Sequence, residues 1–212
     1  ELTWGLLLSL VRNIPSAFDS VLGGEWNRDL YLGTELKGKT IGIVGYGRLG
    51  KMVGVYAKSF GMTVIYNDIN LVSSEIDDEY CSLDDLLLKS DVITVHLPLE
   101  NATTNLLNAE KISKIKPGSV LINTSRGEVI DERSLLDALK SGRLAGAALD
   151  VLCGETSGEA DWLNRNSLVE FARDHQNLLI TPHIGGACPD SMRRTEEFCA
   201  NKLMLALKKL PK

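Results

Sequence analysis

The sequence lacks any pair of cysteines spaced as a metal site or a redox motif requires. Its four cysteines (Cys81, Cys153, Cys188 and Cys199) lie far apart in a chain of 212 residues. A chain of this length can bury a sufficient core without disulfides. We therefore predict reduced, mostly buried thiols, no metal ion and a cytoplasmic protein.

The chain also has no excess of positive charge and no long apolar run. Its 23 lysines and arginines are outnumbered by 28 aspartates and glutamates, which gives a formal charge of −5. That balance argues against a nucleic-acid groove, which needs a basic face. The longest apolar stretch, Trp4–Val11, is too short to span a bilayer, and Glu1 stands where a signal peptide would be basic. We expect neither nucleic acid nor a membrane as a partner.

Short β-branched runs alternate with helical stretches along most of the chain. The runs are apolar throughout, which is typical of parallel strands covered on both faces. The pattern predicts an α/β fold, a Rossmann-type doubly wound parallel sheet with helices on both faces. The predicted strands are 40–44, 63–67, 91–95, 119–123, 144–149 and 178–181, and the predicted helices are 49–60, 83–89, 109–115 and 132–141. Ser82 and Asp131 are predicted to cap helices, and Gly61, Gly118 and Gly142 to end them.

The first 24 residues form a separate apolar region. Aliphatic residues lie almost all round a predicted helix over 2–22, which Pro15 breaks or kinks. Because a helix that is apolar on every side must be buried, this segment serves either core packing or a dimer or interdomain contact. The chain starts at Glu1 without an initiator methionine, so we expect further residues upstream.

A glycine motif follows the first predicted strand and opens a helix. Gly45, Gly47 and Gly50 form the pattern GxGxxG, and Asp68 stands 18 residues after Gly50, at the end of the next strand. The three glycines allow a tight turn, close approach of a diphosphate and close helix–strand packing. The diphosphate would meet free N–H groups at the positive end of the helix dipole. Asp68 would accept the adenosine ribose hydroxyls, and its charge favours NAD over NADP.

Four further segments each lie at the carboxyl end of a predicted strand, where ligands bind in open α/β sheets. A histidine, an arginine and acids at one edge indicate chemistry on a small anionic carbonyl compound. Arginine suits a carboxylate and a developing oxyanion, and histidine suits proton transfer near neutral pH. The segments are His96-Leu97-Pro98-Leu99, Asn123-Thr124-Ser125-Arg126-Gly127, Ala147-Ala148-Leu149-Asp150-Val151 and Thr181-Pro182-His183-Ile184-Gly185-Gly186.

Together with the glycine motif, this series resembles the D-isomer-specific 2-hydroxyacid dehydrogenase family, and the likeness runs over residues 1–212. The resemblance implies that the whole chain is the NAD-binding domain, with the N-terminal part of the substrate-binding domain absent. It implies an NAD-dependent oxidoreductase that acts on the CH–OH group of a small 2-hydroxy acid and works as a homodimer. We expect these 212 residues to bind NAD but to be poorly active alone.

The resemblance also assigns roles to individual residues. Arg126 would hold the substrate's carboxylate and carbonyl oxygen, His183 would be the acid/base, and Glu155 would hydrogen-bond His183. The expected cofactor contacts are Arg48 and Leu49 at the pyrophosphate, Thr124, Ser125 and Asp150 beside the nicotinamide with Asp150 on the carboxamide, Gly185 and Gly186 in the same wall, and His96, Pro98 and Thr103 in a loop beside it.

Two other functions remain open from the sequence. One is a non-catalytic NAD(H)-sensing module of the kind found in corepressors that resemble this family, and the other is a dehydrogenase of another small anion such as formate. The particular hydroxy acid, the working direction and the role of a long segment over 156–176 also remain open.

Overall fold

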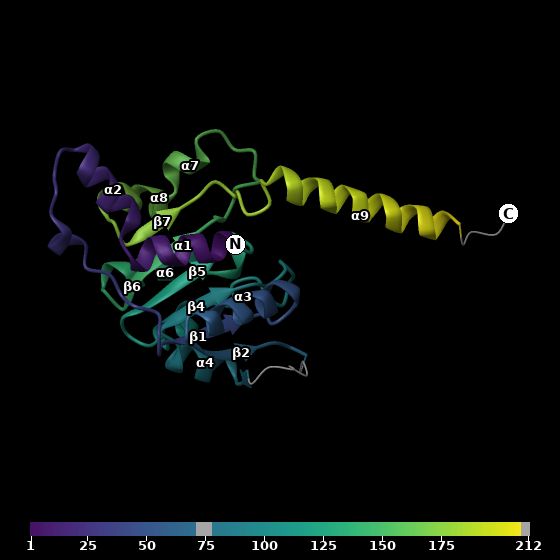
Figure 1. The fold of residues 1–212 in the computed structure, drawn as a ribbon, viewed down its shortest axis with the longest axis horizontal. Coiled ribbons are helices and arrows are strands. Elements are labelled where there is room, and N and C mark those ends of the chain that lie inside the picture. The colour runs from purple at the N-terminus through teal and green to yellow at the C-terminus, as the bar shows by residue number, and fades with distance from the viewer. Residues whose placement is uncertain (71–77, 209–212) are drawn as a thin grey trace.

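In the computed structural model, which describes residues 1–70 and 78–208, seven strands form one parallel sheet. Its order is β3-β2-β1-β4-β5-β6-β7, and it reverses between β1 and β4 (Figure 1). The predicted doubly wound Rossmann-type sheet is confirmed. The strands are β1 Thr40–Val44, β2 Thr63–Asn67, β3 Glu79–Tyr80, β4 Val92–Val95, β5 Ser119–Asn123, β6 Leu144–Leu149 and β7 Leu178–Ile180.

The helices between the strands begin and end within a few residues of their predicted bounds. They are α3 Arg48–Ser59, α4 Leu83–Lys89, α5 Ala109–Ser113 and α6 Glu132–Lys140. The predicted caps are present: Ser82 Oγ accepts the N–H of Asp85 at 3.1 Å, and Asp131 Oδ1 accepts that of Ser134 at 2.9 Å. The three predicted helix-ending glycines all have positive φ, from 70° to 81°.

Two apolar clusters cover the two faces of the sheet, because successive strand residues point to opposite sides. Ile41 and Ile43 of β1 belong to the cluster that includes Leu7 of helix α1 (Leu2–Val11) and Val53 of α3. Val95 and Leu121 belong to the other cluster, with side chains of α4, α5, α6 and helix α8 (Ser167–Asp174). The sheet is therefore buried on both sides, as its apolar strands predict.

The N-terminal region differs from its prediction as one apolar helix interrupted at Pro15. It forms two helices, α1 and α2 (Ile14–Leu22), separated at Asn13, whose φ is 53°. Pro15 lies in the first turn of α2, where a missing N–H costs nothing. Helix α1 buries Trp4, Leu7 and other side chains against the sheet, whereas α2 buries none. Core packing is therefore confirmed for α1 only, and the dimer or interdomain contact stays a prediction for α2.

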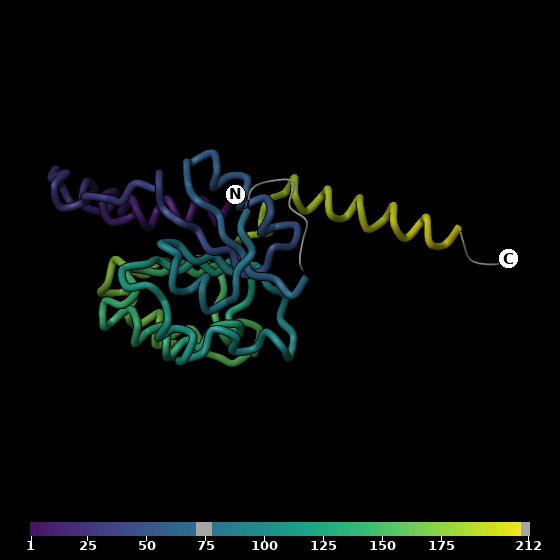
Figure 2. The backbone as a smooth tube through the Cα atoms, turned by 90° about the horizontal axis from the view of Figure 1, so that it is seen from below, coloured from purple at the N-terminus to yellow at the C-terminus, as the bar shows by residue number. Residues whose placement is uncertain are grey.

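Several segments lie beyond the predicted elements, among them strand β3. The 3-10 turns η1 (Arg28–Tyr31) and η2 (Gly127–Val129) lie in connections, and the segment over 156–176 contains the short helix α7 (Trp162–Arg165) as well as α8. Helix α9 (Pro189–Leu207) extends away from the rest of the chain and buries none of its residues (Figures 1 and 2).

The cysteines are unpaired, but their burial differs from the prediction. Cys81 is buried and Cys153 half-buried, whereas Cys188 and Cys199 are exposed, because they lie at the start of α9 and within it. Across residues 1–70 and 78–208, none of the helices has the length and apolar content that crossing a membrane requires.

Gly42 in β1 permits close packing of α4 on the sheet. A Cβ at this position would lie 2.1 Å from Ser90 Oγ and 2.5 Å from Leu86 Cδ2. We expect Gly42→Ala to lower the free energy of unfolding by about 1–3 kcal/mol through overpacking. Gly5→Ala, at an open position in α1, should instead raise it by up to about 1 kcal/mol through helix propensity.

Urea denaturation of the two variants beside the unchanged chain measures both effects. Equal stability of Gly42→Ala and the unchanged chain would contradict the packing argument.

Candidate active site

The glycine loop after β1 contains two glycines that the fold requires and one that it does not. Gly45 has a φ of 92°, and a Cβ there would lie 2.5 Å from the carbonyl oxygen of His96. A Cβ on Gly50 would lie 2.2 Å from the carbonyl oxygen of Gly45. Gly47 has a φ of −75°, and a Cβ there would meet nothing within 4 Å. Its lack of a side chain therefore leaves open space beside the loop.

Gly47 is also the N-cap of α3, a helix of twelve residues. The first N–H groups of a helix have no partner within the helix, and its dipole attracts negative charge there. Arg48 and Leu49 are the first two residues of α3, and both are exposed. An open cradle of backbone N–H groups fits the diphosphate of a dinucleotide.

Asp68 lies beside the glycine loop with its carboxylate fixed. Its Oδ2 accepts the N–H of Tyr46 at 2.7 Å, and its Oδ1 accepts the N–H of Asn70 at 2.9 Å. Each carboxylate oxygen can accept more than one hydrogen bond, so the side chain keeps acceptor capacity for ribose hydroxyls. The loop and Asp68 together fit the adenosine diphosphate half of NAD.

Asn123, which the sequence reasoning did not select, shapes the loop after β5. Its Oδ1 accepts the N–H and the Oγ–H of Ser125 at 3.0 and 2.8 Å, and its Nδ2 donates to the carbonyl of Arg126 at 2.8 Å. The loop therefore presents Arg126 at the surface, where its Nη1 donates to the carbonyl of Ser125 at 2.6 Å. A polar residue at the end of an apolar strand was the available signal.

Gly127 brings the Arg126 loop against the loop that follows β6. A Cβ at Gly127 would lie 2.2 Å from the carbonyl carbon of Leu152 and 2.3 Å from the nitrogen of Cys153. No side chain larger than hydrogen fits between these backbones. The loop carrying Arg126 and the loop leading to Glu155 are therefore in direct contact.

Asp150 connects the loop after β6 with the loop after β7. Its side chain is buried, and its Oδ1 accepts the hydroxyl of Thr181 at 2.6 Å and the N–H of Ile184 at 2.8 Å. Its Oδ2 accepts the N–H of Gly185 at 2.8 Å. Thr181 was not selected from the sequence. The carboxamide contact expected of Asp150 stays a prediction.

His183 and Glu155 form the hydrogen bond expected between them. His183 Nδ1 lies 2.6 Å from Glu155 Oε1, and the two side chains are 45% and 17% exposed. His183 has a φ of 52°, which is uncommon for a residue with a side chain and marks local strain. Its N–H donates to the carbonyls of Asp150 and Thr181, which stabilises this conformation.

The remaining predicted contacts lie in the loop after β4 and beside α1. Burial lowers the pKa of His96 to about 4, and its Nε2 lies 2.9 Å from Thr94 Oγ1, so the ring is neutral near pH 7. Thr103 Oγ1 donates to the carbonyl of Pro98 at 2.7 Å, which stabilises the loop itself. Thr124 Oγ1 lies 2.9 Å from Thr3 Oγ1 in α1. Contacts of these residues with a cofactor stay predictions.

The site residues fall into two groups along the carboxyl edge of the sheet. The glycine loop and Asp68 follow β1 and β2, whereas Arg126, Asp150 and His183 follow β5, β6 and β7. At about 4.8 Å between neighbouring strands, β1 and β6 are about 14 Å apart. The order reverses between the groups, where ligands bind in such sheets.

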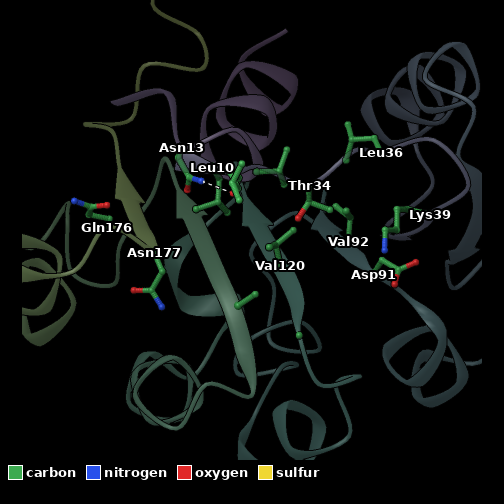
Figure 3. Close-up of a pocket in the computed structure, with 14 residues that line it drawn as sticks. Leu10, Asn13, Thr34, Leu36, Lys39, Asp91, Val92, Val120, Gln176 and Asn177 are labelled. Atoms are coloured by element: carbon green, nitrogen blue, oxygen red, sulfur yellow. Dashed lines mark hydrogen bonds between the residues drawn. The ribbon is translucent and has the colours of Figure 1, made fainter. Parts of the chain in front are cut away.

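One cavity of the structure lies beside this edge, and another lies at the opposite edge of the sheet. One of about 460 Å³ lies between α7, α8 and β7, with Glu155 and Pro182 in its wall. Another of about 290 Å³ lies at the amino ends of β1, β4, β5 and β6, where Figure 3 shows Lys39 pointing towards Asp91. The second contains none of the predicted site residues, so it is not part of this site.

The chain also matches a known family of NAD-binding domains. Residues 4–185 match the family described as "D-isomer specific 2-hydroxyacid dehydrogenase, NAD binding domain". The chain is 41% identical to the D-3-phosphoglycerate dehydrogenase of Bacillus subtilis over 214 residues, which is 100% of this chain but 39% of that protein. It thus spans well under half of that relative's length.

Two solved structures are similar in fold. D-lactate dehydrogenase from Aquifex aeolicus, complexed with NAD and lactic acid, matches with a TM-score of 0.86 at 34% identity, over 97% of this chain and 65% of that one. D-2-hydroxyisocaproate dehydrogenase matches with a TM-score of 0.90 at 28% identity, over 100% and 66% of the two chains.

The open space at Gly47 separates a binding requirement from a folding requirement. We expect Gly47→Ala to stay folded, with a loss of at most about 1 kcal/mol from the poorer N-cap, but to bind NAD about tenfold more weakly or worse, because the methyl group would occupy the proposed place of the diphosphate. Isothermal titration calorimetry measures the affinity, with Gly5→Ala as the control at another open position. Unchanged NAD affinity in Gly47→Ala would show that the diphosphate lies elsewhere.

Proposed function

The chain belongs to the D-isomer specific 2-hydroxyacid dehydrogenases, and from that premise we propose that its protein transfers hydride between NAD and a 2-oxo acid/D-2-hydroxy acid pair. The hydrogen bond of 2.6 Å between His183 and Glu155 carries the proposal, because it supplies an oriented acid/base at the edge that also bears the glycine loop. Bound NAD supplies the acceptor or donor of the hydride.

His183 moves the proton. Since Glu155 accepts from Nδ1, the other ring nitrogen, Nε2, is the one that can reach the substrate. In oxidation Nε2 takes the hydroxyl proton as the C–H bond gives up its hydride. In reduction the imidazolium returns that proton to the oxygen as hydride adds to the carbonyl carbon. Glu155 orients the ring and offsets its charge when both nitrogens are protonated.

Arg126 binds the anion. A 2-oxo acid carries a carboxylate throughout, and its carbonyl oxygen gains charge as hydride adds. The planar guanidinium can donate to both groups, and charge-assisted hydrogen bonds of this kind are the strong ones. Its exposed position after β5, two strands from the loop of His183, supports this role.

The relatives suggest which substrate to test first. The Bacillus subtilis relative is described as a D-3-phosphoglycerate dehydrogenase, and the solved neighbours act on D-lactate or D-2-hydroxyisocaproate by their names. We propose D-3-phosphoglycerate as the first candidate. A panel of these acids and formate, assayed by NADH absorbance, discriminates between the candidates, and absence of turnover with every member would favour an NAD(H)-sensing module.

We also propose that the substrate-binding part of the enzyme lies outside residues 1–212. The chain spans 39% of its Bacillus subtilis relative, which supports a further domain. On this proposal residues 1–212 bind NAD but turn over poorly alone. The unpaired cysteines support a cytoplasmic protein.

Replacement of His183 tests the proposed proton transfer. We expect His183→Gln to lower kcat by about 10²–10⁴-fold in the active enzyme that contains this chain, without changing its affinity for NAD. His175→Gln, at an exposed histidine of the segment over 156–176, is the matched control and should leave kcat unchanged. Retention of most of kcat in His183→Gln would refute His183 as the acid/base.

The exposed surface of α2 and η1 supports a homodimer. Phe18, Leu22 and Trp26 are 62%, 71% and 89% exposed, which is unusual for three large apolar side chains in one short region. We propose that a second copy covers them. Leu22→Glu should convert the dimer to a monomer at micromolar concentration in analytical ultracentrifugation, whereas Val55→Glu on α3 should not. A monomeric unchanged chain would contradict the proposal.

A further inference from the structure

Tyr46, between the first two glycines of the loop, has an environment that diphosphate binding does not explain. Its side chain is fully buried and stacks on the ring of Tyr66, with ring centroids 4.1 Å apart and an interplanar angle of 20°. The ring lies against α3, where a Cβ on Gly54 would come within 2.9 Å of the Tyr46 hydroxyl. Gly54 thus leaves room for the Tyr46 hydroxyl.

Tyr46 contacts two carboxylates that lie ten residues apart in the chain. Its N–H donates to Oδ2 of Asp68, which follows β2, at 2.7 Å. Its hydroxyl donates to Oδ2 of Asp78, which precedes β3. One residue of the glycine motif therefore holds both ends of the connection from β2 to β3.

Asp78 is held by a second partner on α3. Its side chain is fully buried, and its Oδ1 lies 2.6 Å from Nζ of Lys58, in the last turn of that helix. Removing one partner of a buried carboxylate strongly destabilises the fold, because an uncompensated charge is left buried. Burial and the contact with Asp78 hold the pKa of Tyr46 well above its usual range, so the hydroxyl stays a donor near pH 7.

We propose that Tyr46, Asp78 and Lys58 position Asp68 for the ribose hydroxyls of the adenosine half of NAD, and thereby set the affinity of the chain for the cofactor. The proposal rests on NAD binding and not on which hydroxy acid is the substrate. The three are positioning residues, since Asp68 itself is the residue proposed to contact the ribose.

The physical reason is that one residue carries both contacts. The N–H of Tyr46 can hold the Asp68 carboxylate in a fixed orientation only while its ring keeps its place under α3. The hydrogen bond from the Tyr46 hydroxyl to Asp78 holds the ring in that place, and the ion pair with Lys58 holds Asp78. A carboxylate accepting hydrogen bonds from two ribose hydroxyls depends on orientation, so a small displacement reduces its contribution to binding.

The experiment compares three variants of the full chain by calorimetric titration with ADP-ribose and with NAD. Tyr46→Phe removes the hydroxyl but keeps the stacked ring, and Lys58→Met removes the charge on Asp78's other side. We expect both to weaken ADP-ribose and NAD by the same factor, about three- to tenfold. Tyr80→Phe is the matched control, because Tyr80 is half-exposed and meets Tyr66 only edge on.

Urea denaturation shows whether each variant is stably folded. Kinetics then distinguish a specific loss of NAD binding from a general loss of stability. In the active enzyme that contains this chain, Tyr46→Phe and Lys58→Met should raise the KM for NAD and leave kcat unchanged, and Tyr80→Phe should change neither. ADP-ribose affinity equal to that of the unchanged chain in folded Tyr46→Phe, or equal loss in Tyr80→Phe, would overturn the proposal. If Tyr46→Phe does not fold, unchanged affinity in Lys58→Met overturns it.

The titrations with ADP-ribose and NAD do not depend on turnover. A chain that binds NAD normally but belongs to a protein without dehydrogenase activity would contradict the proposed function and leave this inference intact.

Discussion

The buried carboxylate of Asp150 holds together the loops around His183, and the position of His183 depends on it. Its two oxygens accept three donors from residues 181–185, and its backbone bonds to Asn123 on one side and to His183 on the other. These bonds offset the cost of removing a carboxylate from water. They also hold His183 in a backbone conformation that is unfavourable by itself.

The two groups of site residues at the carboxyl edge of the sheet differ in chemistry: one consists mainly of backbone groups and the other mainly of side chains. The nucleotide end consists mainly of backbone: glycines that leave space, N–H groups at the start of α3, and one carboxylate fixed by the N–H of Tyr46. The end around Arg126 and His183 consists of side chains bonded to loop backbone, such as Asn123 with Arg126 and Asp150 with Gly185. A diphosphate is recognised by its charge and size alone, whereas a proton and a carboxylate need side chains at defined positions.

Local patterns predicted the sheet and most of the helices that cover it, and the resemblance to the dehydrogenase family implied the hydrogen bond of Glu155 with His183. The sequence pattern did not predict the break at Asn13. It predicts a break at Pro15, but proline is tolerated in the first turn of a helix, and Pro15 lies in the first turn of α2. Nor did it identify Asn123 and Thr181, whose roles arise from contacts between loops far apart in the chain. Helix α9 was also not predicted, and its exposure leaves Cys188 and Cys199 at the surface.

The contact at Gly127 has a mechanical consequence. Because a Cβ there would lie 2.2 Å from the carbonyl carbon of Leu152 and 2.3 Å from the nitrogen of Cys153, any side chain would force apart the segment that carries Arg126 and the segment that leads to Glu155. The packing of these two segments therefore helps to set the separation between Arg126, the proposed anion-binding residue, and Glu155, the proposed partner of the acid/base. On the proposed function, substrates of different size would then be accommodated by surfaces outside these two loops.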